Sequence, residues 1–319
     1  MKNTLTYSAI VLLLASAACN KTDGVVGEGD GIIRFAPAAE ETRALVYQST
    51  LNAETFRVYD FKDGEKYIDN KIKYGTTGWV YVDEEDYLWK ATEHNLFGYS
   101  DGLGALPENK KVALEAVMTT SLASGNQVDY LYSEIVNTTA DAWKHTTGNT
   151  KDTPVKLNMK HLFTAVSMGV KNAKSSEIVL TSVTIPAIAG NGSATIDYSG
   201  SAVNVQYTGP TVAETPFVSA AAAANAPLSA GGLFDLLTQS VATPTPYVVW
   251  PQTIPASTVT VNYTMNGNSY VATAAIPSVK WEAGKLNTYL LSINNADDIM
   301  LTFTVKDWQE GATENYEFE

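Results

Sequence analysis

Short stretches of alternating apolar and polar residues run along most of this chain, and turn-forming residues separate them. This period of two is typical of β-strands that bury one face. In the segment KLNMKHLFTAVSMGVK (156–171), every second residue from Leu157 to Ser167 lies on one phase of a strand. In EIVLTSVTIPAI (177–188) the apolar phase slips near Ser182, which predicts a β-bulge.

Three further segments predict strands joined by turns. The segment TVTVNYTMNGNSYVATAAI (258–276) is centred on Asn266-Gly267, a dipeptide typical of a two-residue hairpin turn. The segment GWVYVDEEDYLWK (78–90) places an acidic turn between two aromatic pairs. Near the C-terminus, DIMLTFTVKDW (298–308) alternates through Ile299, Leu301, Phe303 and Val305. All three segments therefore favour β-structure.

Helical periodicity is scarce. Pro107–Leu122 is the best candidate for a helix, and the alanine-rich segment further on predicts a short helix around Leu233–Leu237. Many short strands with frequent turns predict an all-β fold. The chain length suits two domains, which we expect to meet in the polar linker Gly148–Lys156. The predicted domains are residues 32–152 and 153–319.

The N-terminus reads as an export signal. Lys2 precedes an uncharged run from Leu5 to Ala18, which is too short for a membrane span. Small residues then lead into Cys19, an arrangement that resembles the lipobox of bacterial lipoproteins. We therefore expect a signal peptide of residues 1–18, a lipid on Cys19, and a glycine-rich tether over residues 19–31. The alternative is an ordinary signal peptide cut near Ala18.

Composition narrows the class of protein. Hydrophobic residues make up 45% of the chain and charged residues 17%, so the chain has the composition of a globular protein. Cys19 is its single cysteine, so the fold has no internal disulfide. The net charge of −13 argues against nucleic acid or an anionic membrane surface as a partner.

The chain carries no motif of a catalytic or metal site. Zinc, nucleophile-elbow, P-loop and EF-hand patterns are all missing from the sequence. His94, His145 and His161 share no ligand spacing, and we expect them not to converge. His161 lies on the apolar phase of its strand, which favours a hydrogen-bonded core or interface residue. We expect no enzyme activity, no cofactor and no metal.

Two weaker candidates for a binding site remain open. The acidic run Asp83–Asp86 could supply oxygen ligands to calcium, but it lacks the asparagine and glycine of a shaped loop, which favours a solvated turn. Aromatic residues could stack on sugars, or could belong to the β-sheet cores; these are Trp79, Trp89 and Trp143.

Ordered segments over nearly the whole mature chain resemble the fimbrillins of the Bacteroidales. They are YLWKATEHNLFGYSDG, VDYLYSEI, KLNMKHLFTAVSMGVK, VVWPQTI, VKWEAGKLNTYLLSI and FTVKDWQ, preceded by Thr42-Arg43-Ala44. The resemblance implies two tandem β-sandwich domains of transthyretin-like type in a lipoprotein that is exported to the outer membrane. It also implies a structural role in surface fimbriae, known as type V pili, with other fimbrial subunits as partners.

The resemblance further implies how subunits join. In the family an N-terminal strand is removed by an arginine-specific protease, and a strand from the next subunit replaces it. Here the removable strand would carry Ile32, Ile33 and Phe35, and cleavage would fall between Arg43 and Ala44. The C-terminal segment is the natural donor strand, through Leu301, Phe303 and Val305. Alternatively, Arg43 is a surface charge in a linker and the C-terminal strand stays in its own domain.

Two alternative functions remain compatible with the sequence. A surface glycan-binding lipoprotein would share the lipobox, the acidic charge and the β-domains, and would present a coplanar aromatic platform. A tip or anchor subunit of the same fimbria would share the fold. A tip lacks a free C-terminal donor strand, and an anchor keeps its N-terminal strand uncut. The alternating C-terminal segment favours a shaft-type subunit.

Overall fold

The prediction of an all-β fold is confirmed. The computed structural model describes residues 31–39, 51–117, 128–146, 148–150, 153–185, 187–216, 225–294 and 299–307. Within these ranges the helical elements are the short α-helix α2 (Ala140–His145) and the 3-10 turn η1 (Asp101–Leu103). No helix in the described part of the chain is long and apolar enough to cross a membrane.

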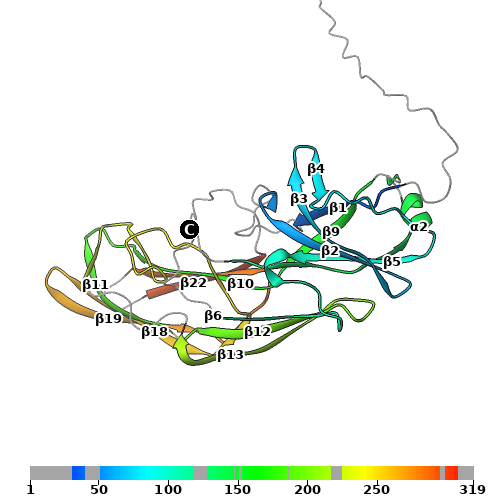
Figure 1. Cartoon of the computed structure of the whole chain (residues 1–319). Helices are drawn as coiled ribbons and strands as arrows, with labels where there is room; N and C mark the ends of the chain where they lie inside the picture. The colour runs from blue at the N-terminus through cyan, green and yellow to red at the C-terminus, as the bar shows by residue number, and fades with distance from the viewer. Residues whose placement is uncertain are drawn as a thin grey trace, which may run out of the picture.

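An eight-stranded sheet, here called the first sheet, forms one end of the elongated molecule (Figure 1). Its strand order is β1 (Phe35–Ala39), β9 (Val155–His161), β7 (Leu131–Ser133), β5 (Glu93–Ser100), β2 (Thr55–Lys62), β3 (Glu65–Gly75) and β4 (Gly78–Tyr81), with β8 (Val136–Thr139) also paired to β5.

Four smaller sheets make up the rest of the described fold. The second sheet has the order β15 (Leu233–Asp235), β10 (Thr164–Asn172), β21 (Lys285–Ile293) and β22 (Ile299–Asp307), with β16 (Tyr247–Val249) on β10. The third sheet has the order β14 (Ala226–Leu228), β11 (Ile178–Thr184), β18 (Ser257–Met265) and β19 (Asn268–Ile276). The fourth contains β13 (Asn204–Pro216), β12 (Ala189–Asp197) and β6 (Lys111–Val117), and the fifth contains β17 (Gln252–Ile254) and β20 (Val279–Trp281).

Three clusters of buried side chains hold these sheets together. One lies against the first sheet, and another lies between the second and third sheets. The third cluster is rich in aromatic rings and joins the first sheet to β12 and β16. In it Phe97 stacks on Tyr59 at 5.5 Å and on Tyr198 at 4.0 Å between ring centroids. The two ends of the molecule therefore share a packed core.

Several strand predictions are confirmed in detail. The hairpin of β18 and β19 turns at Asn266 and Gly267, whose φ angles of 52° and 79° are those that a tight hairpin turn requires. The pairing of β11 with β18 shifts register between Leu180 and Ser182, which is the predicted bulge. The C-terminal alternating segment forms β22.

Both helix predictions are wrong. The segment Pro107–Leu122 contains β6, in which buried Val112 is flanked by exposed residues and pairs with Ile196 of β12. The pairing of this segment with β12 selects a strand, although its apolar residues are also spaced as in a helix. Leu233–Leu237 contains β15, followed by a turn in which the Asp235 carboxylate accepts a bond from Leu237 N at 2.8 Å.

The alternation of apolar and polar residues also failed to predict the break between β9 and β10 and the short helix α2. The one-phase segment 157–167 is two strands, because Leu162 and Phe163 are both fully buried where the chain passes from β9 to β10. Helix α2 begins after Thr139, whose hydroxyl accepts a hydrogen bond from Ala142 N at 3.1 Å. A threonine at the N-cap position was the signal in the sequence from which this helix could have been predicted.

Strands also pair across the predicted domain boundary. β9 begins inside the predicted linker at Val155 and pairs with β1 and β7 of the first sheet. β6 comes before the linker and pairs with β12, which comes after it. The boundaries at residues 152 and 153 stay a prediction.

Candidate functional site

The segment that was predicted to be removable lies at the edge of the first sheet. β1 runs parallel to β9, with Phe35 opposite Val155, and among the described strands β9 is its one ladder partner. Ile33 and Phe35 are 0% and 2% exposed and pack in the core cluster against this sheet. Ile32 is half-buried and forms a bridge with Leu88. Two of the three predicted side chains are thus buried.

The hydrogen bonds of β1 leave its outer edge open. Arg34 O accepts a bond from Val155 N at 2.7 Å, so Ala36 and Ala38 face β9 in the parallel ladder. The backbone groups of Phe35 and Pro37 therefore point away from β9. Pro37 has no N–H to offer on that side, which is a common way to protect an edge strand from further pairing.

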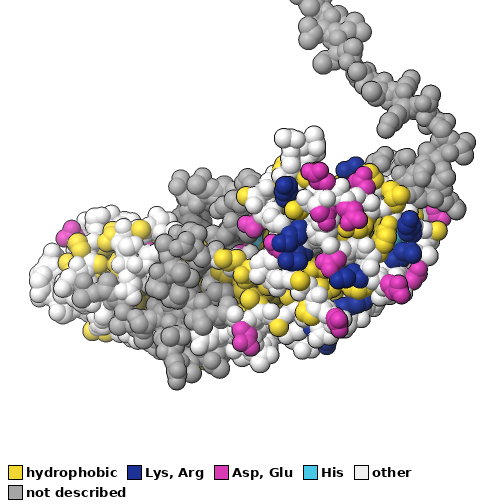
Figure 2. All heavy atoms as spheres, viewed as in Figure 1, with side chains coloured by type: hydrophobic (Ala, Val, Ile, Leu, Met, Phe, Trp, Pro, Cys, Tyr) yellow, Lys and Arg dark blue, Asp and Glu magenta, His cyan; other side chains and the backbone are white. Residues whose placement is uncertain are grey.

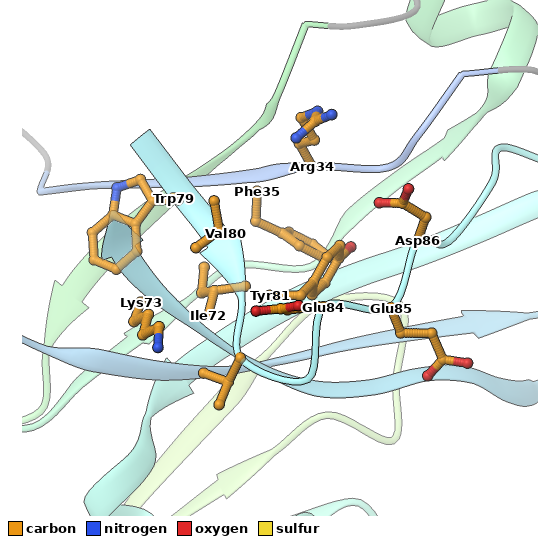
Figure 3. Close-up of a pocket in the computed structure, with 11 residues that line it drawn as sticks. Arg34, Phe35, Ile72, Lys73, Trp79, Val80, Tyr81, Glu84, Glu85 and Asp86 are labelled. Atoms are coloured by element: carbon orange, nitrogen blue, oxygen red, sulfur yellow. The ribbon is translucent and has the colours of Figure 1, made fainter. Parts of the chain in front are cut away.

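A cavity of about 340 Å³ lies between β1 and β4, the two ends of the first sheet (Figure 3). Phe35 of β1 and Arg34 just before it line one side, and Val80 and Tyr81 of β4 line the other. Figure 3 shows Asp86, in the acidic turn after β4, on the opposite side of the cavity from Trp79.

Tyr81 ties the two sides together. Its hydroxyl donates to Ile33 O at 2.7 Å, and its ring meets that of Phe35 edge to face at 6.3 Å. Burial raises the pKa of Tyr81 well above that of an exposed phenol, so the hydroxyl keeps its proton. Sequence reasoning noted the alternation of Tyr81 with Trp79 but not this contact, because the contact depends on which distant segment fills the edge.

The chain has three arginines, Arg34, Arg43 and Arg57. The carbonyl of Arg34 is bonded to β9, and Arg57 lies in β2 between β3 and β5 with its Nε 2.7 Å from Asp101 Oδ1. Both described arginines are therefore held at the first sheet, Arg57 within β2 and Arg34 just before β1. Arg43 and Ala44, like Cys19, lie outside the described residues.

β22, the predicted donor strand, is an edge strand of the second sheet. It pairs with β21 and also lies beside β19 of the third sheet. Leu301 and Phe303 are half-buried, and Phe303 stacks on Tyr289 at 4.5 Å. Val305 and Met300 are each 47% exposed. Much of the strand's side-chain surface thus remains accessible.

The three histidines lie in separate surroundings. His94 Nδ1 lies 2.5 Å from Asp60 Oδ2, and both side chains are fully buried. His161 Nδ1 lies 2.6 Å from Asp129 Oδ2, which confirms a buried, hydrogen-bonded histidine. His145 is exposed at the end of α2. No group of potential ligands in the described residues could hold a metal ion.

Replacing His94 with alanine is expected to lower the free energy of unfolding by about 3–5 kcal/mol, because the Asp60 carboxylate then stays buried without its side-chain partner. Urea unfolding followed by circular dichroism measures this as a lower midpoint. The matched control is His145→Ala, an exposed site where a change within about 0.5 kcal/mol is expected. Equal midpoints for His94→Ala and the parent would contradict the prediction.

The three tryptophans considered as candidates for sugar stacking do not form a shared exposed platform. Trp89 is 1% exposed and stacks on Trp143 at 6.1 Å. Trp79 packs edge to face on Phe56 and on Tyr74, each at 5.5 Å. These contacts fit the interpretation of core residues.

The acidic run forms an exposed turn. Glu84 is exposed, the carboxylate of Asp83 accepts a bond from the Asn70 amide, and Tyr87 Oη donates to Glu85 Oε2 at 2.8 Å. These bonds fit a solvated turn anchored to its neighbouring strands.

A family model described as Fimbrillin-like matches residues 42–308. The chain belongs to the fimbrillin-like family. Its fold is similar to that of a fimbrial protein from Bacteroides vulgatus (TM-score 0.52, 13% identity, 88% of this chain and 100% of that one). It is also similar to a candidate cell adhesion protein from Bacteroides ovatus (TM-score 0.50, 15% identity, 87% of this chain and 97% of that one). Among curated proteins, none matches.

Proposed function

We propose that this chain is a structural subunit of surface fimbriae that polymerises by exchanging β-strands between copies. Its place in the fimbrillin-like family supports this, and so does the name of its B. vulgatus neighbour. The observation that carries the proposal is β1. Its Phe35 is buried in the core, as is Ile33 just before it, and the strand has one ladder partner among the described strands. Its removal would leave a groove along β9 that another strand can fill.

The distribution of arginines supports cleavage at Arg43. A protease needs its substrate as an extended, accessible segment, which an edge or central strand in a sheet cannot offer without unfolding. Arg57 lies in β2 of the first sheet, and Arg34, just before β1, is bonded through its carbonyl to Val155 of β9. Cleavage between Arg43 and Ala44 by an arginine-specific protease would release Ile32, Ile33 and Phe35 together with the lipidated tether.

The features of β22 support its role as donor. It is an edge strand, its residues alternate, and Leu301, Phe303 and Val305 lie on one side of it. A strand that leaves the edge of one sheet and joins the edge of another replaces the backbone hydrogen bonds that it loses with new ones. A free donor of this kind favours a shaft position over a tip, and a cleaved first strand favours it over an anchor.

The N-terminal residue of the surface protein tests this function. Subunits recovered from detergent-resistant filaments should begin at Ala44 by N-terminal sequencing. Subunits that begin at Cys19, with no filaments, would instead support the second candidate, an outer-membrane glycan-binding lipoprotein. The aromatic contacts of Trp79, Trp89 and Trp143 give that candidate less support.

We also propose that the precursor is held at the outer membrane by a lipid on Cys19. Cys19→Ser should abolish labelling by a radioactive fatty acid, since the thiol is the acylated group, and should leave the precursor uncut or move it out of the membrane fraction. Each buried methylene of an acyl chain contributes about 0.8 kcal/mol to membrane binding, so losing the chains removes the anchor. Unchanged labelling of the Cys19→Ser variant would contradict the proposal that the protein is a lipoprotein.

A further inference from the structure

Basic residues are missing from a long part of the chain. Between Lys174 and Lys280 the sequence contains no lysine, arginine or histidine. In the view of Figure 2, Lys and Arg side chains gather at the end that carries the first sheet, and none is seen at the opposite end, where β11 and β19 lie. This end, which carries no basic side chain in that view, is therefore distinct from the end that carries the first sheet.

The outer surface of the third sheet lies in this region and is uncharged. Its inward residues, such as Val261 and Ala272, are buried, while the alternate residues are exposed or half-exposed. In register across β11, β18 and β19, the outward residues form three rows: Thr184, Thr260 and Thr273; Ser182, Asn262 and Val271; and Val179, Thr264 and Ser269. We call these nine residues the threonine face. Glu177, just before β11, is at its rim.

Other exposed sheet faces of the same molecule carry charges. On the fourth sheet, Lys111 of β6 forms an ion pair with Asp197 of β12 at 2.8 Å, and Glu115 is exposed nearby. On the first sheet, Lys66 pairs with Asp69 at 2.5 Å. The threonine face contains no charge among its nine members, and its exposed apolar side chain is Val271, at 57% exposure.

We propose that the threonine face is an interface between copies of this chain. Burying it removes no charge from water, and the centres of protein interfaces are depleted in charged residues for this reason. Its hydroxyl and amide groups can bond to the same groups of a partner; Asn262 Nδ2 already donates to Ser182 Oγ at 2.8 Å within the face.

Electrostatics selects a second copy as the occupant. Two molecules with a net charge of −13 repel each other over most of their surfaces, and the repulsion is smallest where two uncharged faces meet. A strongly charged partner would gain no ion pair here. Such a partner would also lose hydration without compensation.

The size of the face sets the strength of the contact. Three strands at about 4.8 Å spacing, over the five residues from Thr260 to Thr264 or about 17 Å of strand, give roughly 250 Å² per copy, about a third of the ~800 Å² of a stable pair. Isolated subunits should therefore associate weakly. Copies arrayed along a filament would hold neighbouring filaments side by side, because many weak contacts act together. The contact uses neither β1 nor β22, so it does not depend on strand exchange.

Crosslinking of unpolymerised full-length chain tests the proposal. In a Cys19→Ser background, Val271→Cys places one thiol on the threonine face, and Val241→Cys places one at a site of equal exposure, 57%, outside it. A short bismaleimide should yield several-fold more dimer from Val271→Cys than from Val241→Cys. Adding Thr260→Lys and Thr273→Lys to Val271→Cys should lower that yield to the level of the control.

Three results would overturn the proposal: equal dimer yields at the two positions, a yield that the two lysines leave unchanged, or a yield that falls steeply with added sodium chloride. The last would mean that charged groups elsewhere bring the copies together. Because the assay uses subunits that retain their own first strand, it can fail while strand exchange succeeds, or succeed while strand exchange fails.

Discussion

Arg43→Ala is expected to give a folded, membrane-held subunit that forms no filaments. Without an arginine at this position the protease has no residue to read there, so β1 stays joined to the rest of the chain. Phe35 of this strand and Ile33 just before it then keep filling the core beside β9. A tethered strand competes at an effective concentration near the millimolar range, which a donor from another copy cannot match. Detergent-resistant ladders on gels, together with N-terminal sequencing, measure the outcome.

Arg34→Ala is the matched control. The Arg34 side chain is exposed, and its carbonyl keeps its bond to Val155 N after the substitution. This variant should be cut and should polymerise like the parent. If Arg43→Ala forms ladders like the parent, cleavage at this site is not the trigger. If Arg34→Ala blocks assembly instead, the cleavage site has been assigned to the wrong arginine.

The strands could be predicted because apolar and polar residues alternate along a strand when one of its faces is buried and the other is exposed. In β18, Val259, Val261 and Tyr263 face the core while Thr260 and Asn262 face outward, and the hairpin dipeptide fixes the register with β19. The bulge in β11 was visible as a slip of the same phase. These features are local, so one segment of sequence is enough to show them.

The errors arose where tertiary packing decides the structure. β6 has apolar residues at spacings that a helix or a strand could use, and pairing with β12 selected the strand. At Leu162 and Phe163 the chain leaves the first sheet for the second, so both side chains are buried and the period of two fails. Neither effect is visible without knowing the partner strand.

The candidate site shows the same limit. The resemblance singled out Ile32, Ile33 and Phe35 as the side chains of the removable strand, but the partner strand β9 lies far along the chain, with Phe35 opposite Val155. Alternation cannot identify such a partner, since every strand with an apolar face is equivalent by that criterion. The hydroxyl of Tyr81 on Ile33 O and the cavity beside it depend on this pairing too.

Val305→Asp is expected to abolish polymerisation while leaving the subunit folded and cleaved. In the free subunit Val305 is 47% exposed, so the change in unfolding free energy should stay within about 0.5 kcal/mol. As a donor residue, the same side chain must enter an apolar groove, where an unpaired carboxylate is costly. Each loss of about 1.4 kcal/mol lowers the association constant tenfold, so a drop of at least tenfold in ladder yield is expected.

Met300→Asp is the control that makes this test specific. Met300 lies in the same strand, is equally exposed at 47%, and falls on the opposite phase from Leu301, Phe303 and Val305. If β22 is donated through that phase, Met300→Asp should polymerise like the parent, and its urea midpoint should match that of Val305→Asp. Loss of assembly in both variants would indicate that charge anywhere on β22 is harmful. Assembly of Val305→Asp at the level of the parent would show that β22 stays in its own sheet, paired with β21.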